Sequence, residues 1–449
     1  MMLLTACFYG SAVFGGECAT CGGETDVDLG CTTCGAPALA SCGEASCGEV
    51  SCCEASTTPW RQKHFCLFDV NGYVNAGGIF NTHGAQYNLN HVNSDNEMGL
   101  DGAYISMVRQ AKTGCGTVDW GFGSDFMFGR DARFLSGYAG WDSDWTTGHR
   151  SSNFNNYETL DEANRAGYGF AMPQLYGEVS ANYLTLKVGH FYTPMGYESA
   201  RADERFFYTL GRDFEVTPIT HSGALVTWDR INNVEVSGGY VIGENNTFDE
   251  EYNEHLFLGM IRAKLNPLAD AKYSVLMGDG AVQGYRGHQF RQSFVLKSQL
   301  TDRLETAFVF SNGSFDATEE QAGPVSLDGN ASSGYSIGGN IADLMSLCRS
   351  DNLKYMTFGG HAYYKLNECW KTGFRMEWQK GTTETANYID ESLEAIDIAV
   401  GANWNPCGND NLVLRPELRY DRVTTLVFGK TFADSKDQLS LGGDIMYRF

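Results

Sequence analysis

Residues 117–128, TVDWGFGSDFMF, decide the fold class because their large side chains fall on every second position. Successive side chains of a β-strand point to opposite faces. One face would carry Val118, Trp120, Phe122, Phe126 and Phe128, and the other Asp119, Gly121, Gly123 and Asp125. The stretch therefore predicts a strand with one apolar and one polar face.

The same alternation recurs around residues 369–379 and again at 412–421. In the second stretch, Arg415, Glu417 and Arg419 share one face, opposite an unbroken apolar row that includes Pro416. A soluble sandwich would not usually place such a charged row opposite an apolar one. Strands between lipid and a polar lumen alternate in this way.

Composition excludes several other classes. Aromatic residues make up 13% of the 449 residues, which is too many for a disordered chain, and no stretch of 18 apolar residues predicts a membrane-spanning helix. The net charge of -23 argues against nucleic acid as a partner, since phosphates require a basic face.

The spacing of the strands predicts an all-β, transmembrane antiparallel β-barrel of about 16 strands, with 14 to 18 compatible. Seven connections are short and eight are longer, and those at 129–171 and 312–352 reach about forty residues. Alternation of short turns with long loops is typical of an outer-membrane barrel, and the sequence has no repeat that would indicate a propeller. An even number of strands places both termini on the side of the short turns, which is the periplasmic side. The expected strands are 67–80, 99–110, 117–128, 172–181, 183–192, 221–229, 233–243, 255–265, 271–279, 289–299, 303–311, 353–366, 368–380, 395–405, 411–421 and 437–449.

The chain ends on an alternating strand whose last residues include Tyr447 and Phe449. A terminal aromatic residue on such a strand resembles the insertion signal of bacterial outer-membrane barrels. Tyr447 and Phe449 are therefore the expected membrane insertion signal.

The N-terminal region predicts export. Residues 1–16 are expected to be a signal peptide, truncated in this sequence because no basic residue precedes Arg61. Residues 17–65 form a Cys-rich flexible periplasmic tail, and residues 66–449 form the barrel. Disulfides, within the tail or to a partner, are favoured over zinc on the CxxC pairs. The disulfide candidates are Cys18, Cys21, Cys31, Cys34, Cys42, Cys47, Cys52, Cys53, Cys369 and Cys407, the last two in neighbouring turns.

No cofactor or metal is expected. Acidic stretches at 248–251 and 318–320 offer carboxylates for Ca²⁺, but such clusters are more often a solvated surface. His221 and Ser222 are adjacent on a predicted strand and point to opposite faces, so they cannot form a catalytic dyad. We therefore expect that the protein is not an enzyme, and an outer-membrane hydrolase is the least favoured hypothesis.

Residues 186–198, LKVGHFYTPMGYE, together with 205–208 and 219–225, resemble the β-barrel porin-2 (OmpL-like) family found in Planctomycetes. The resemblance covers most of residues 66–449. A looser likeness reaches the phosphate-selective porin O/P group through Gly189, Phe191, Pro194, Gly196 and Glu198. That group implies trimers and a third loop folded into the pore. Met195 replaces its usual aromatic residue and no lysine cluster follows, so phosphate selectivity does not carry over.

The resemblance makes residues 193–220 the expected pore constriction loop. Its charged residues are Glu198, Arg201, Asp203, Glu204, Arg205, Arg212, Asp213 and Glu215. The lumen-phase residues Lys187, Arg291, Lys297, Arg375, Arg415, Glu417 and Arg419 form the expected lumen wall, largely basic. An acidic loop against a basic wall would orient small polar solutes.

The function expected is an outer-membrane porin, a water-filled channel through which small polar solutes or ions diffuse. Its partners would be outer-membrane lipid and further copies of the chain, as a trimer by analogy. The alternative is a structural or adhesive surface barrel that acts through its long loops and Cys-rich tail.

Overall fold

The computed structural model divides the chain into two units, residues 1–54 and 55–449. The structure describes residues 63–65, 68–82, 98–113, 118–135, 168–246, 248, 254–282, 285–318, 352–385, 388–406, 409, 411–423 and 435–449. The expected signal peptide, the Cys-rich tail up to residue 62 and Cys407 lie outside these residues.

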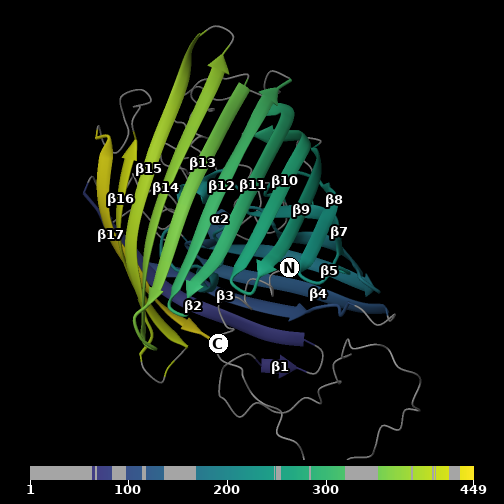
Figure 1. Ribbon diagram of the computed structural model, residues 1–449, viewed down its shortest axis with the longest axis horizontal. Helices are drawn as coiled ribbons and strands as arrows, with labels where there is room; N and C mark the ends of the chain where they lie inside the picture. The colour runs from purple at the N-terminus through teal and green to yellow at the C-terminus, as the bar shows by residue number, and fades with distance from the viewer. Residues whose placement is uncertain are drawn as a thin grey trace, which may run out of the picture. The chain divides into compact units, whose positions relative to one another are not determined.

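The described residues of the second unit form a closed antiparallel barrel (Figure 1). Each strand from β2 to β17 pairs with the next, and β17 pairs with β2, so the ring has sixteen strands. The short strand β1 pairs with the start of β2. The predicted sixteen-stranded barrel is confirmed. The strands are β1 (Lys63–Phe65), β2 (Phe68–Asn81), β3 (Gly99–Arg109), β4 (Val118–Gly129), β5 (Gly169–Ala181), β6 (Leu184–Tyr192), β7 (Thr220–Trp228), β8 (Val234–Val241), β9 (His255–Asn266), β10 (Ala269–Val282), β11 (Tyr285–Thr301), β12 (Leu304–Ala317), β13 (Asn352–Lys365), β14 (Trp370–Thr385), β15 (Tyr388–Trp404), β16 (Leu412–Val423) and β17 (Asp437–Arg448).

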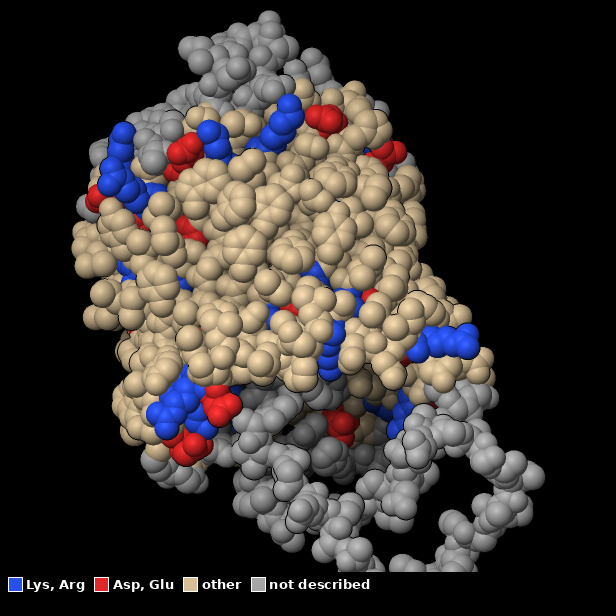
Figure 2. All heavy atoms as spheres, viewed as in Figure 1, with Lys and Arg blue, Asp and Glu red and all other residues tan. Residues whose placement is uncertain are grey.

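The two faces of each strand separate as the sequence predicts. On β16, Leu418 is 47% exposed on the outer face, whereas the next residue, Arg419, is 2% exposed inside. Figure 2 shows one side of the barrel as a broad uncharged band, with most charged side chains toward the ends of the strands. A closed ring also pairs the backbone groups of every strand, which a hydrocarbon environment requires.

Tight turns connect the strands on one side of the barrel. Asn182 and Asn233 occupy two of them with positive φ angles of 57° and 67°. Asparagine tolerates this left-handed conformation better than most residues. Both turns fall where the sequence predicts short connections.

Two connections predicted to be long are instead two-residue hairpins. β10 and β11 pair as far as Val282 and Tyr285, and β14 and β15 pair as far as Thr385 and Tyr388. The strands continue beyond the length needed to cross a bilayer, and the sequence Gln283-Gly284 contains a glycine that favours hairpin turns. The prediction of eight long connections was therefore wrong at these two places.

Helical structure is confined to short segments in the described chain: α2 (Ala132–Leu135), η4 (Ala202–Glu204) and α4 (Arg212–Glu215). None of the helices in the described residues is long and apolar enough to cross a membrane.

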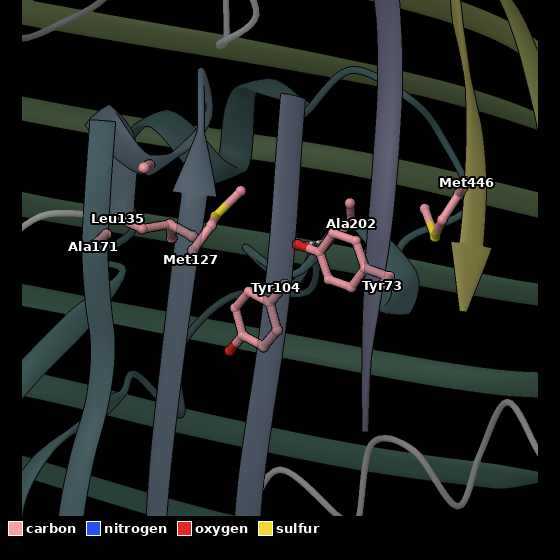
Figure 3. Packing of buried hydrophobic residues seen from close by; sticks show 8 residues of the cluster. Tyr73, Tyr104, Met127, Leu135, Ala171, Ala202 and Met446 are labelled. Carbon is pink, nitrogen blue, oxygen red and sulfur yellow. Dashed lines mark hydrogen bonds between the residues drawn. The ribbon is translucent and has the colours of Figure 1, made fainter. Parts of the chain in front are cut away.

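One buried cluster lies inside the barrel, where the loop after β6 meets the wall (Figure 3). Tyr73 of β2 and Tyr104 of β3 stack with ring centroids 5.1 Å apart. Ala202 of η4 packs in the same cluster, and its backbone N–H donates to the Tyr73 hydroxyl at 3.2 Å. The cluster fixes one end of the loop against β2 and β3.

Candidate functional site

Residues 193–219, which connect β6 to β7, turn into the barrel and contact the inner face on several sides. The Gly196 N–H donates to Ser293 of β11 at 3.3 Å, and the Thr209 N–H donates to Glu417 of β16 at 2.9 Å. The Tyr208 hydroxyl donates to Asp101 of β3 at 3.1 Å. Because these strands are far apart around the ring, this segment crosses the lumen; we call it the lumen loop.

Three arginines of the wall hold the lumen loop through its backbone. Arg375 of β14 donates to the Thr209 carbonyl at 2.8 Å, and Arg419 of β16 donates to the Leu210 carbonyl at 2.5 Å. Arg415 donates to the carbonyl oxygens of Ala202 at 2.6 Å and Arg205 at 3.0 Å. Each of the three side chains is almost fully buried. The planar guanidinium group of arginine can donate hydrogen bonds to several acceptors at once.

Each of these arginines also pairs with a carboxylate on the wall. Arg375 lies 3.0 Å from Asp397, Arg415 lies 2.6 Å from Asp444, and Arg419 lies 2.8 Å from Asp421. The wall therefore alternates in charge, whereas the sequence predicts a largely basic wall. Glu417, expected on the wall, accepts hydrogen bonds from the backbone N–H and the hydroxyl of Thr209.

Most charged residues of the lumen loop are paired within the loop or with its surroundings. Arg201 lies 2.7 Å from Asp203 and 3.5 Å from Glu204. Arg212 lies 3.1 Å from Glu215. The remaining pairs join Glu198 to Arg375 at 3.0 Å, Arg205 to Asp131 at 3.4 Å, and Arg212 to Asp421 at 3.1 Å.

Asp213 differs because it faces a second carboxylate. Its backbone N–H donates to Glu377 of β14 at 2.7 Å, and its side chain accepts a hydrogen bond from Thr357 at 2.7 Å. Burial, with the Glu377 carboxylate adding to it, raises the pKa of Asp213 to about 6. Burial likewise raises the pKa of Glu204 and of Glu215.

The other predicted wall residues line the inner face away from this anchorage. Lys187 of β6 lies 3.8 Å from Glu178 and over the ring of Tyr176. Arg291 of β11 lies 2.7 Å from Glu244 and donates to the Val216 carbonyl at 2.7 Å.

Lys297 of β11 lies over the ring of Tyr197, with its Nζ 5.1 Å from the ring centroid. Lys187, Arg291 and Lys297 therefore point into the lumen from strands of the wall other than those that carry Arg375, Arg415 and Arg419.

Sequence reasoning missed the acids of the wall: Glu377, Asp397, Asp421 and Asp444. Glu377 shares a strand phase with Arg375, and Asp421 shares one with Arg419, so the alternation contained that signal. The register places Asp397 opposite Glu377 and Asp444 opposite Arg415. Sequence reasoning also missed Lys272 of β10, which lies on the inner phase of a predicted strand.

The expected insertion signal lies at the seam of the barrel. Tyr447 is partly exposed on the outer face, and the backbone of Phe449 exchanges two hydrogen bonds of 2.9 Å with Gly72. A Cβ atom at Gly72 would collide with the Tyr104 carbonyl oxygen and would lie 2.8 Å from the Phe449 ring, so glycine is needed at this close approach.

Cys369 forms a disulfide, and its partner lies outside the described residues. Among the described residues, no three His, Cys, Asp or Glu side chains are grouped to hold a metal ion. The tail cysteines and most of the two acidic stretches lie outside those residues.

Ser222 pairs with His190 of β6 rather than with its neighbour His221. The Ser222 hydroxyl lies 2.8 Å from His190 Nδ1 and donates its proton to the Asn246 carbonyl at 2.9 Å. His221 instead contacts Thr193 and the Gly243 carbonyl. Because the serine proton is held by a carbonyl, His190 is not placed to remove it.

A sixteen-stranded lipid-facing barrel with a polar, loop-crossed lumen defines an outer-membrane diffusion channel. The chain belongs to the family described as putative beta-barrel porin-2, OmpL-like, which matches residues 68–449. It is an integral outer-membrane porin through which solutes diffuse passively, and it is not an enzyme.

Solved porin structures share the fold at low sequence identity. The trimer form of OmpT from Vibrio cholerae is 11% identical with a TM-score of 0.51, and the match covers 85% of this chain and 99% of that one. An anion-selective porin from Comamonas acidovorans is 12% identical with a TM-score of 0.50, covering 85% and 98%. The channel DcaP of Acinetobacter baumannii is 11% identical with a TM-score of 0.51, covering 86% and 99%. The comparison with curated proteins gave no match.

Proposed function

We propose that the lumen loop, residues 193–219, forms the constriction of this porin and limits passage to small polar solutes or ions. The observation that carries the proposal is the anchorage of the loop by Arg375, Arg415 and Arg419. Three buried arginines that bind backbone carbonyls hold the loop across the lumen, where it reduces the free cross-section.

The field at the constriction follows from the alternating charges. Glu198, Arg201, Asp203, Glu204, Arg205, Arg212, Asp213 and Glu215 of the loop face both arginines and carboxylates. Fixed charges of both signs at a narrow point orient water and favour dipolar solutes, since low-dielectric walls focus the field.

Assembly as a homo-oligomer is supported by the solved neighbours. OmpT of Vibrio cholerae was solved in a trimer form. A trimer of this chain would bury part of its exposed apolar outer face, where side chains such as Leu418 and Leu441 are otherwise in contact with lipid.

Export and insertion complete the proposal. A signal peptide at 1–16 would direct the chain to the periplasm, where the Cys-rich tail would remain. Tyr447 and Phe449 would mark the chain for insertion; the pairing of Phe449 with Gly72 supports a role at the closing seam.

Deleting residues 204–212 tests the constriction. The deletion removes the part of the loop that binds Arg375 and Arg419, and single-channel conductance in a planar bilayer should rise. The control is Arg303→Met in the exposed turn between β11 and β12, which should leave the conductance near that of the wild type. An unchanged conductance in the 204–212 variant would place the constriction elsewhere.

A further inference from the structure

Two lysines on adjacent strands of the lumen wall have no carboxylate partner among the described residues. Neither Lys272 of β10 nor Lys297 of β11 has an ion pair or a side-chain hydrogen bond there, and Lys297 lies over the Tyr197 ring. Both side chains are partly exposed, so lumen water reaches them.

Both lysines belong to the inner face. Ser274, two residues after Lys272, donates to the Pro194 carbonyl of the lumen loop at 3.2 Å, and residues two apart on a strand share a face. Lys297 pairs in register with Asp270, two residues before Lys272, so the lysines are diagonal neighbours. Such neighbours lie about 7–8 Å apart, within reach of long side chains. Figure 1 shows β10 and β11 side by side in the wall.

Other cations on the described inner wall contrast with this pair. Seven of them have a carboxylate within 4.0 Å: Lys187, Arg262, Arg291, Lys371, Arg375, Arg415 and Arg419. Lys272 and Lys297 are therefore a local excess of positive charge in a wall that is otherwise balanced.

The nearest carboxylates in register do not cancel this excess. Asp270 binds Arg262 at 2.7 Å, and Glu235 lies opposite Arg262 on β8. Arg262 in turn lies opposite Lys272, and directly opposed residues lie about 4.5–5.5 Å apart. Asp270 and Glu235 therefore face three cations, Arg262, Lys272 and Lys297, so the positive charges exceed the acids by one and neither lysine forms an ion pair among the described residues.

We propose that Lys272 and Lys297 form an anion-binding subsite in the lumen, beneath the Pro194–Tyr197 part of the loop. Its ligands are small solutes that carry a carboxylate or phosphate group, and two free ammonium groups suit a doubly charged oxyanion. The proposal rests on the channel function and adds a preference for the sign of the solute.

The test is the reversal potential of single channels in a tenfold KCl gradient at pH 6, where lysine side chains are protonated. The wild type should favour chloride over potassium. An ammonium group about 5 Å from the ion path raises the local concentration of a monovalent anion about fourfold in water. The variant Lys272→Gln/Lys297→Gln should lower the chloride-to-potassium permeability ratio by at least that factor.

Two controls separate charge from damage to the fold. Lys380→Gln removes a lysine from the outer phase of β14, where it pairs with Glu394 at 2.9 Å, and should leave the ratio unchanged. Lys272→Arg/Lys297→Arg keeps both charges and should retain the wild-type ratio.

The ligand class is tested by adding inorganic phosphate or malonate to symmetric KCl. Block by phosphate alone would assign phosphate groups, block by malonate alone would assign carboxylates, and block by both would assign doubly charged oxyanions generally. In each case the glutamine variant should lose the block.

If neither phosphate nor malonate blocks the wild type, or if the glutamine variant keeps the wild-type permeability ratio, the subsite is overturned while the channel function stands. A pure, folded wild type that gives no stepwise current would overturn both.

Discussion

Arg375 is the side chain whose loss should most clearly release the lumen loop. Its guanidinium donates to the Thr209 carbonyl at 2.8 Å, the Leu210 carbonyl at 3.3 Å and Glu198 at 3.0 Å, besides Asp397 at 3.0 Å. Arg375→Met removes these bonds and leaves Asp397 buried without its principal partner. Removing one member of a buried ion pair costs about 3–5 kcal/mol.

We expect Arg375→Met to lower the free energy of unfolding by that amount, measured by guanidinium titration of the protein in lipid vesicles. Single-channel recordings should show a higher and noisier current, since the loop loses one anchor. The added substitution Asp397→Asn should recover part of the stability because it neutralises the unpaired carboxylate.

Arg303→Met provides the matched control, since Arg303 is exposed in the turn between β11 and β12. Exposed substitutions usually change stability by no more than about 0.5 kcal/mol. If Arg375→Met matches this control in both stability and conductance, Arg375 does not anchor the loop.

Three further predictions concern other parts of the molecule. The pKa of Asp213 is raised from 3.8 to about 6 in the folded protein. The folded state therefore holds the proton more tightly than the unfolded state, so the stabilisation is complete below about pH 4 and is lost as the pH rises through 6. Asp213→Asn should reduce that dependence in denaturation measured from pH 4 to 8 and add up to about 3 kcal/mol at pH 8; an unchanged slope would show that Asp213 is not one of the titrating groups. Phe449→Ala should slow barrel assembly in vesicles, followed by heat-modifiable gel mobility, because the ring packs over Gly72; assembly at the wild-type rate would argue against the insertion signal. Non-reducing peptide mapping should join Cys369 to Cys407, because the Cys369 carbonyl accepts a hydrogen bond from the Asn405 N–H at 2.9 Å; a link to a tail cysteine would contradict this.

The strands of the barrel could be predicted from the sequence because lipid and lumen act on alternate residues. Leu418 and Arg419 show how closely burial follows the alternation. The extended hairpin at Val282 and Tyr285 could not be predicted in this way, since strands outside the bilayer are not required to alternate.

The partners of the loop were less accessible to sequence reasoning. Arg375 and Thr209 are 166 positions apart, and strand phase states only that Arg375 points inward. Which carbonyl it binds depends on the path of the loop, and periodicity carries no information about that path. Glu377, Asp421 and Lys272, in contrast, were detectable from phase alone.

The most direct test of the porin assignment is a planar-bilayer recording of the purified, folded wild-type protein. The structure predicts discrete stepwise currents whose size increases with salt concentration, as expected for a water-filled lumen. A folded protein that inserts into the bilayer and never gives stepwise current would contradict the assignment and favour a structural or adhesive barrel.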